Sequence, residues 1–247
     1  IMDRKTYMKN IYSKYWISAR EKKYGFLQYD KDLCSYISKH ITTGEKILEV
    51  GIGTGFPFGD FFQKKGYQIY GVDIAPTLIE KCKKLNNKIV CKVGDAENLD
   101  YPDNFFKCTY CFHSTFYFPN ICKAIDEMLR VVNSKGLIIF DIQNKNNKLV
   151  LKEFRKLKLY KNNLFWKLLR YAKNIIRIII RKGAPDWTNV VHEVPADPEI
   201  IFKHLKDKKI TNYKIMVKSK EKIGLEIKNE IVSLEDWPRL IFVIWKP

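Results

Sequence analysis

The chain has 247 residues, of which 46% are hydrophobic and 14% aromatic, and a formal net charge of +18. This length and apolar fraction exclude an intrinsically disordered chain. They predict one large α/β domain with an insertion, or at most two small domains. Between residues 144 and 182, 13 Lys and Arg against the single acid Glu153 give +12 of the net charge. Because the charge is concentrated in one segment, the total alone does not indicate a nucleic-acid-binding protein.

The predicted elements begin with a helical segment over residues 1–40, which we expect to form a lid. From residue 41 to 143, short apolar runs alternate with amphipathic helical patterns. This alternation predicts a doubly wound, parallel sheet with right-handed crossovers and helices on both faces. Strands are expected at 46–51, 67–73, 88–99 (with its exit loop), 105–113 and 137–143, and helices at 56–66, 75–86 and 120–132.

Residues 144–195 break this rhythm, and we expect a basic lid or substrate insertion there. Beyond it, residues 196–207 indicate a helix, and residues 212–220 and 239–246 indicate two strands. We expect these two strands to pair like a hairpin at the sheet edge. Residues 196–247 would then complete the sheet of the 41–143 core.

The N-terminal residues and the cysteines indicate the cellular compartment in which we expect the protein. The first residues, IMDRKTYMKN, are charged and lack a continuous apolar run, so we expect neither a signal peptide nor a membrane anchor there. The six cysteines lie in or beside apolar runs, which favours reduced, buried thiols in a cytoplasmic protein. Cys108 and Cys111 have CxxC spacing, but no second ligand pair is spaced to complete a zinc site. We therefore expect no metal.

A glycine-rich stretch, ILEVGIGTG, follows the first expected strand of the core. Small residues there allow a ligand to approach the backbone closely. The dinucleotide fingerprint G-x-G-x-x-G would require glycine at position 56, where this chain has Phe56. This difference disfavours a nicotinamide-dinucleotide oxidoreductase.

The G-x-G-x-G form, with the acid Glu49 two residues earlier, instead resembles the first motif of class I, Rossmann-like S-adenosylmethionine-dependent methyltransferases. Four segments resemble that family in order, and together they are more specific than a glycine motif alone. The resemblance implies S-adenosylmethionine as cofactor and a mostly parallel, seven-stranded sheet whose last strand is antiparallel. The matching segments, within residues 45–143, are ILEVGIGTG, VDIAPTLIEKCKK, GDAENLDYPDNFFKCTYCFH and EMLRVVNSKGLIIFDIQ.

The resemblance also assigns cofactor-binding residues. Asp73, at the end of the second strand, is expected to accept hydrogen bonds from ribose hydroxyls, as an acid about twenty residues after the glycines does in nucleotide sites. Asp95 and the backbone of Ala96 are expected to hold the adenine, and Glu49 to reach the methionine part or brace the loop. Taken alone, Asp73 or Asp95 would suit a helix cap or turn. The expected set is Glu49, Gly51, Gly53, Gly55, Asp73, Ile74, Asp95, Ala96 and Phe112.

Two histidines are candidate catalytic residues. His113 ends the fourth strand, facing the crevice where ligands bind in such sheets. We interpret it as a general base or a substrate contact, and the alternative is an imidazole that satisfies a loop carbonyl. His192 precedes the late helix, a place from which family members bring a substrate-facing residue back to the site. Tyr15, Tyr24 and Tyr117 are candidates for a substrate lid, with simple packing as the alternative.

Residues 164–182 predict a basic amphipathic helix with a wide apolar stripe, too charged to span a bilayer. Two interpretations remain open: a lid helix packed on the core, or a helix lying on an anionic membrane surface. The loop after the fourth strand, HSTFYFPN, differs from the Asp/Asn-Pro-Pro-Tyr/Phe loop of many relatives that methylate nucleic-acid amines.

These features favour O- or N-methylation of a small-molecule, glycan or lipid-linked acceptor. The alternatives are an RNA or protein methyltransferase that uses the basic insertion, and a non-catalytic membrane or nucleic-acid adaptor with this fold.

Overall fold

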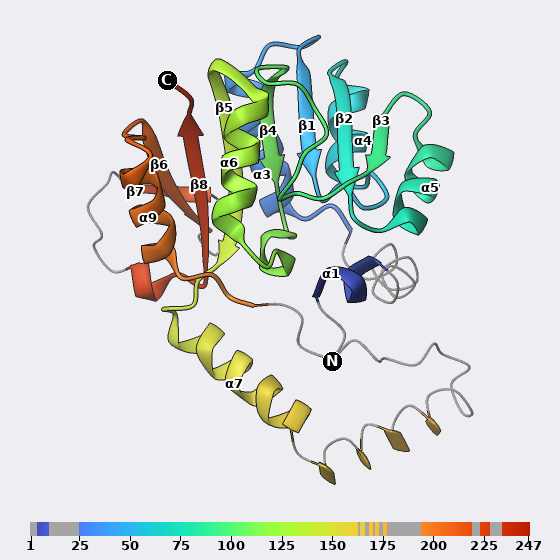
Figure 1. The fold of residues 1–247 in the computed structure, drawn as a ribbon, viewed down its shortest axis with the longest axis vertical. Coiled ribbons are helices and arrows are strands. Elements are labelled where there is room, and N and C mark those ends of the chain that lie inside the picture. Colours follow the sequence, from blue (N-terminus) through green and yellow to red (C-terminus); the bar gives the residue numbers. More distant parts are fainter. Residues whose placement is uncertain are drawn as a thin grey trace.

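The computed structural model describes residues 4–9, 25–162, 194–218, 223–227 and 234–247, with the pairs 164–165, 168–169, 171–172 and 175–176. Within these ranges, an eight-stranded sheet lies between two layers of helices (Figure 1). The elements in chain order are α1 (Arg4–Tyr7), α3 (Gln28–His40), β1 (Lys46–Val50), α4 (Phe58–Lys64), β2 (Gln68–Asp73), α5 (Pro76–Leu85), β3 (Val90–Val93), β4 (Phe106–Cys111), η2 (Thr115–Tyr117), α6 (Ile121–Val131), β5 (Val132–Gln143), α7 (Lys148–Asn162), α9 (Pro198–Asp207), β6 (Tyr213–Lys218), β7 (Ile223–Ile227), η4 (Leu234–Asp236) and β8 (Arg239–Trp245).

The strand order is β3-β2-β1-β4-β5-β8-β6-β7. The first five strands in this order are parallel. β8 is antiparallel to both β5 and β6, and β7 is antiparallel to β6. The order reverses between β1 and β4, because β2 and β3 lie on one side of β1 and β4 lies on the other. In open α/β sheets, ligands bind beyond the carboxyl ends of the strands at such a reversal.

Alternate residues of the central strands face the two helix layers, as the two-residue period of a strand requires. In β5, Leu137 and Ile139 join the core cluster that contains residues of α3, α4 and α5. Ile138 and Phe140 join the second cluster, with residues of α6 and α9. The sheet is therefore buried on both faces, which explains why its strands are continuous apolar runs.

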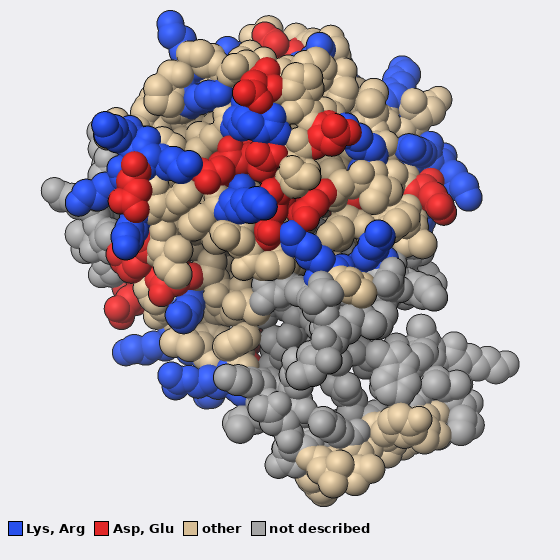
Figure 2. Space-filling view, viewed as in Figure 1, with Lys and Arg blue, Asp and Glu red and all other residues tan. Residues whose placement is uncertain are grey.

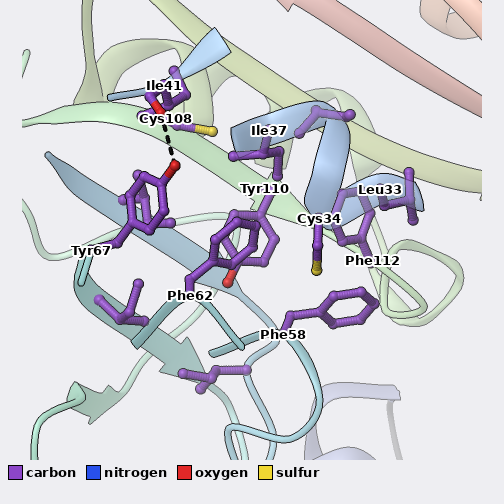
Figure 3. Packing of buried hydrophobic residues seen from close by; sticks show 14 of the residues in the cluster. Leu33, Cys34, Ile37, Ile41, Phe58, Phe62, Tyr67, Cys108, Tyr110 and Phe112 are labelled. Carbon is purple, nitrogen blue, oxygen red and sulfur yellow. Dashed lines mark hydrogen bonds between the residues drawn. The ribbon is translucent and has the colours of Figure 1, made fainter. Parts of the chain in front are cut away.

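Packed aromatic side chains connect α4, in the layer of α3, α4 and α5, to β4 (Figure 3). The rings of Phe62 and Tyr110 have centroids 5.3 Å apart, and those of Phe58 and Phe112 are 5.0 Å apart. Leu33 of α3 is fully buried in the same cluster. This packing fixes the start of α4 and the end of β4, which both border the crevice described below.

The predicted sheet is confirmed in class, with differences in detail. It has eight strands rather than seven, because β7 pairs with the outer edge of β6. β6 and β8 pair as expected, but neither is an edge strand, since β8 lies between β5 and β6. β5 begins at Val132 rather than residue 137, because Val132 pairs with Phe106 before a register shift. Of the helical segment expected over residues 1–40, α1 and α3 are described, and residues 10–24 lie outside the described ranges.

Candidate active site

The loop that follows β1 requires glycine. Gly51, Gly53 and Gly55 have φ values of 80°, 58° and 83°, in the left-handed region. A Cβ atom on Gly51 would also lie 2.5 Å from Ser114 Oγ, closer than real contacts allow. The backbone N–H of Gly51 donates to the carbonyl of Val72 at 2.8 Å, which ties the loop to β2. The loop therefore requires glycine, and it lies at the end of the sheet where the strand order reverses between β1 and β4.

Asp73 ends β2 beside this loop. Its Oδ2 accepts a hydrogen bond from the backbone N–H of Gly53 at 2.9 Å, and its Oδ1 accepts one from Ala75 at 2.9 Å. Burial raises the pKa of Asp73 to about 6, although backbone N–H groups of Ala75, Gly53 and Ile74 act in the opposite direction. A carboxylate in this position is close to neutralisation at mildly acidic pH.

A crevice of two adjoining halves opens at this edge. The halves enclose about 500 Å³ and 530 Å³, including space that is open to solvent. Both are lined by Met8, Gly51, Asp73, Ser114 and Tyr117. The first half adds Glu49, Ile52, Gly53, Phe56, Phe58, Ala75, Leu78, Phe112 and His113, and the second adds Lys5, Val50, Val72, Ile74, Gly94, Asp95, Ala96, Glu97, Phe118 and Pro119.

The crevice brings together most of the residues expected from the sequence. Only Gly55 of the expected cofactor set is outside the lining residues. A Cβ on Gly55 would lie 2.9 Å from Asn86 Nδ2, so Gly55 is required where the loop packs on α5. Glu49 is buried, and its Oε2 accepts a hydrogen bond from the Tyr110 hydroxyl at 3.0 Å, which links β1 to β4. Tyr15, Tyr24 and His192 lie outside the described residues.

His113 has contacts at both ring nitrogens. Its Nε2 lies 2.8 Å from Asp30 Oδ1, and its Nδ1 lies 2.9 Å from Arg239 Nη1. Arg239 has no acceptor atoms, so with both hydrogen bonds in place Nδ1 accepts and Nε2 donates to Asp30. Because the lone pair is then on Nδ1, His113 would have to release Arg239 before acting as a general base. Its ring also stacks on Phe58, with centroids 5.9 Å apart, at the wall of the first half.

A buried carboxylate, Asp141 of β5, completes this group. Asp141 is fully buried, accepts the backbone N–H of His113 at 2.8 Å, and forms an ion pair with Arg239. Burial opposes its ionisation, but the charge of Arg239 and the hydrogen bond from the His113 N–H hold the pKa of Asp141 below its ordinary value. Four charged or titratable side chains, from α3, the end of β4, β5 and β8, therefore meet beside the crevice.

Several of these residues were missed from the sequence. Asp141 had a signal, since an acid inside the apolar run LIIFDIQ indicates a buried partner. Asp30 and Arg239 had none, because the residues that they contact lie 83 and 98 positions away. Lys5 and Met8 lie in a short N-terminal segment whose contact with the crevice depends on tertiary structure alone.

Both ends of the basic insertion are anchored at the crevice edge. The N–H of Val194 donates to the carbonyl of Phe116, next to Tyr117, at 2.9 Å. The N–H of Ala196 donates to the carbonyl of Gln143, at the end of β5, at 2.9 Å. The intervening segment therefore leaves and returns beside the site, and α7 extends from there away from the sheet (Figure 1).

Comparison with known proteins identifies the central part of this chain. Residues 48–140 match the model of a family described as a methyltransferase domain. The chain is 31% identical over 106 residues to the aklanonic acid methyltransferase DauC of Streptomyces sp. strain C5, covering 40% of this chain and 48% of the relative. It is 30% identical over 103 residues to a sterol 24-C-methyltransferase of Eremothecium gossypii, covering 39% of this chain and 28% of the relative. The chain thus spans about half the length of the first of these relatives and less than a third of the second.

A solved structure extends the likeness in fold. An S-adenosylmethionine-dependent methyltransferase of Thermotoga maritima aligns with a TM-score of 0.54 and 16% identity, over 88% of each chain. At this identity the alignment shows a shared fold. Its coverage of 88% of this chain is much larger than the family match at residues 48–140.

Proposed function

We propose that residues 48–140, which match a methyltransferase domain, form a class I, Rossmann-like S-adenosylmethionine-dependent methyltransferase domain, and that the chain methylates a small-molecule, glycan or lipid-linked acceptor on oxygen or nitrogen. One observation supports this most directly: the Asp73 carboxylate stands between the two halves of the crevice, next to a loop that only glycine can form. The names of two relatives, which refer to aklanonic acid and to a sterol, support the small-molecule or lipid class.

The lining residues fit the proposed cofactor. Asp95, Ala96 and Ile74 line the second half, which suits adenine, and Asp73 at the junction suits the ribose. Glu49 and Phe112 line the first half, which suits the methionine part. When bound, S-adenosylmethionine supplies a methyl group already activated on a sulfonium sulfur. The chain therefore has to align an acceptor, exclude water and remove a proton where the acceptor requires it.

The acceptor is proposed to enter at the first half, where His113 and Tyr117 line the wall. There His113, held by Asp30 and Arg239, would orient the acceptor or, after release of Arg239 from Nδ1, take its proton. His192 remains a second candidate base within the insertion, between residues 144 and 195.

Binding of S-adenosylhomocysteine to the full chain tests the cofactor proposal. We expect calorimetry to show binding to the wild-type chain. The affinity of Asp73→Ala should be roughly 10- to 100-fold weaker, because hydrogen bonds to a charged group contribute about 1.5–3 kcal/mol each. Asp60→Asn, on an acid of α4 outside the crevice lining, is the matched control and should bind normally. No measurable binding by the wild-type chain would contradict the proposal.

The affinity measured in the same titration should depend on pH. Because the pKa of Asp73 is raised to about 6, acidification below that value should neutralise the carboxylate and weaken binding, and Asp73→Ala should lack this dependence. In the ligand-free chain the sign is opposite: the contribution of Asp73 to stability is present in acid and is lost as the pH rises through about 6.

A second proposal concerns the basic arm, which we define as residues 148–182. Seven of the thirteen large apolar side chains that are exposed among the described residues belong to it. Within residues 164–176 they recur at helical spacing on one face, and with exposures of 45–70% they are not packed on the core. They are Leu149, Leu164, Phe165, Leu168, Tyr171, Ile175 and Ile176. No helix among the described residues is long and apolar enough to span a membrane.

An anionic membrane surface is the partner that suits the arm, since apolar side chains insert at the headgroup boundary while the surrounding Lys and Arg attract anionic lipids. A nucleic-acid partner is less well supported. On the face of the described residues seen in Figure 2, Lys and Arg alternate with Asp and Glu instead of forming a continuous basic surface.

Vesicle binding tests the arm. We expect the full chain to co-sediment with phosphatidylcholine vesicles containing phosphatidylglycerol, and much less with phosphatidylcholine alone. Phe165→Ser combined with Ile176→Ser should weaken this binding roughly tenfold or more, because each large apolar side chain contributes about 1.5–3 kcal/mol on burial. Ile200→Ser, which alters an equally exposed side chain on α9, should have no effect. Binding to RNA without binding to anionic vesicles would favour the nucleic-acid alternative.

A further inference from the structure

A lysine of the N-terminal segment occupies the adenine end of the crevice. Lys5 Nζ lies 2.6 Å from Asp95 Oδ2 and 2.8 Å from Glu97 Oε2. The other oxygens of these acids are also engaged: Asp95 Oδ1 accepts the N–H of Glu97 at 2.9 Å, and Glu97 Oε1 accepts the N–H of Asn120 at 2.7 Å. In this conformation, every carboxylate oxygen of the pair already has a donor.

The segment that carries Lys5 covers the crevice. Met8 is 9% exposed and lines both halves, while Lys5 lines only the second. α1 lies beyond the carboxyl ends of the parallel strands, over the point where the cofactor would enter (Figure 1). Residues 4–9 therefore close the adenine end through one ion-pair cluster and one apolar contact.

The cluster has the properties of a reversible closure. Burial opposes the charge on Lys5, but hydrogen bonds and attraction to Asp95 and Glu97 raise the pKa of Lys5 overall, so it stays charged at neutral pH. The Lys5 and Asp95 side chains are each 34% exposed, so salt can screen their attraction. Glu97, at 8%, is the more buried partner.

We infer that Lys5 is an electrostatic latch on the cofactor site, an inference that rests on the proposed function. Lys5 Nζ lies 2.6 Å from Asp95 Oδ2 and both residues line the second half, so an adenine amine that takes this position on Asp95 has to displace Lys5. Glu97 can retain the ammonium, because its own contact with Lys5 does not involve Asp95. The latch therefore limits how fast the cofactor enters, and it opens more readily as ionic strength rises.

Association kinetics test the latch. With the full chain immobilised and S-adenosylhomocysteine in solution, Lys5→Met should raise the association rate constant roughly 3- to 10-fold at low salt. Raising the salt concentration should speed association to the wild-type chain and remove most of this difference. Lys64→Met makes the same charge change at an exposed pair with Asp60, outside the crevice, and should leave the rate unchanged.

Each other outcome has a defined meaning. Faster dissociation from Lys5→Met without faster association would show that Lys5 retains the cofactor, and an unchanged rate would show that it does not guard the site; either overturns the latch. If no chain binds, the proposed function fails, and backbone hydrogen exchange of residues 4–9 decides separately whether the closure exists. Lys5→Met should accelerate that exchange and Lys64→Met should not, and equal exchange rates would overturn the closure as well.

Discussion

Replacing Gly51 with alanine should reduce binding of S-adenosylhomocysteine about 100-fold or more. The new Cβ would lie 2.5 Å from Ser114 Oγ and 2.6 Å from Ser114 Cβ, so either the glycine loop or the segment after β4 must move. Both border the crevice, and a misplacement of about 1 Å in a site can cost about 10²-fold. Calorimetry on the folded variant measures the loss.

The backbone strain of this change can be separated from the clash. Gly51 has a φ of 80°, where a non-glycine residue costs about 1–2 kcal/mol. Gly44→Ala is the matched control, because Gly44 has a φ of 93° and nothing within 4 Å of an added Cβ. Gly44→Ala should lose similar stability and keep its affinity. Adding Ser114→Gly to the Gly51 variant should restore part of the binding. Affinity within a few-fold of wild type in Gly51→Ala would show that the ligand does not approach this loop.

The second large effect is expected on stability. Arg239→Met should lower the free energy of unfolding by about 3–5 kcal/mol at neutral pH, because it leaves the carboxylate of Asp141 buried without its principal charge partner. Asp141→Asn should cost less, since Arg239 is 20% exposed and can be hydrated. The double variant should be more stable than Arg239→Met alone, which is the coupling that a double-mutant cycle detects. Urea unfolding gives all of these values.

A control and a pH series sharpen this test. Arg130 is 32% exposed and pairs with Glu127 and with Asp103, whose side chain is 67% exposed. Arg130→Met should therefore cost only on the order of 1 kcal/mol. Because the pKa of Asp141 is lowered in the fold, its contribution is present above about pH 4 and is lost as the pH falls through its folded-state pKa. Equal losses in the two arginine variants would show that burial does not set the effect.

The sequence predicted those elements of the fold that depend on the residues of one short segment. Glycine after an apolar run marks the end of β1, and Asp73 ends the next strand, so both could be placed without knowing the tertiary structure. The apolar runs of β1, β2 and β4 predicted strands because both faces of each are covered. β7 was not expected, and it exists through pairing with β6.

The contacts that surround the site were not predictable in the same way. Lys5 meets Asp95 across 90 positions, and Asp30 meets His113 across 83. Nothing distinguishes Lys5 from the other members of a set of 45 Lys and Arg until the chain is folded. His113 could be located at the end of β4, but its role depends on which groups reach its two nitrogens. Those groups come from α3 and β8, at opposite ends of the chain order.

The bridge between Asn144 and Ala196 has a consequence for how such a chain can diversify. The chain leaves the sheet at Asn144 and returns to it at Ala196, and these two residues pair. The residues between them therefore form an insertion, here called the cassette, whose two ends are adjacent. Longer loops cost little additional closure entropy, and a cassette of another length or composition could occupy the same two attachment points. The glycine loop and Asp73 would be untouched by such an exchange, while the crevice wall beside Phe116 and Tyr117 would be rebuilt. The proposed acceptor site and the proposed cofactor site can in this way change independently within one domain.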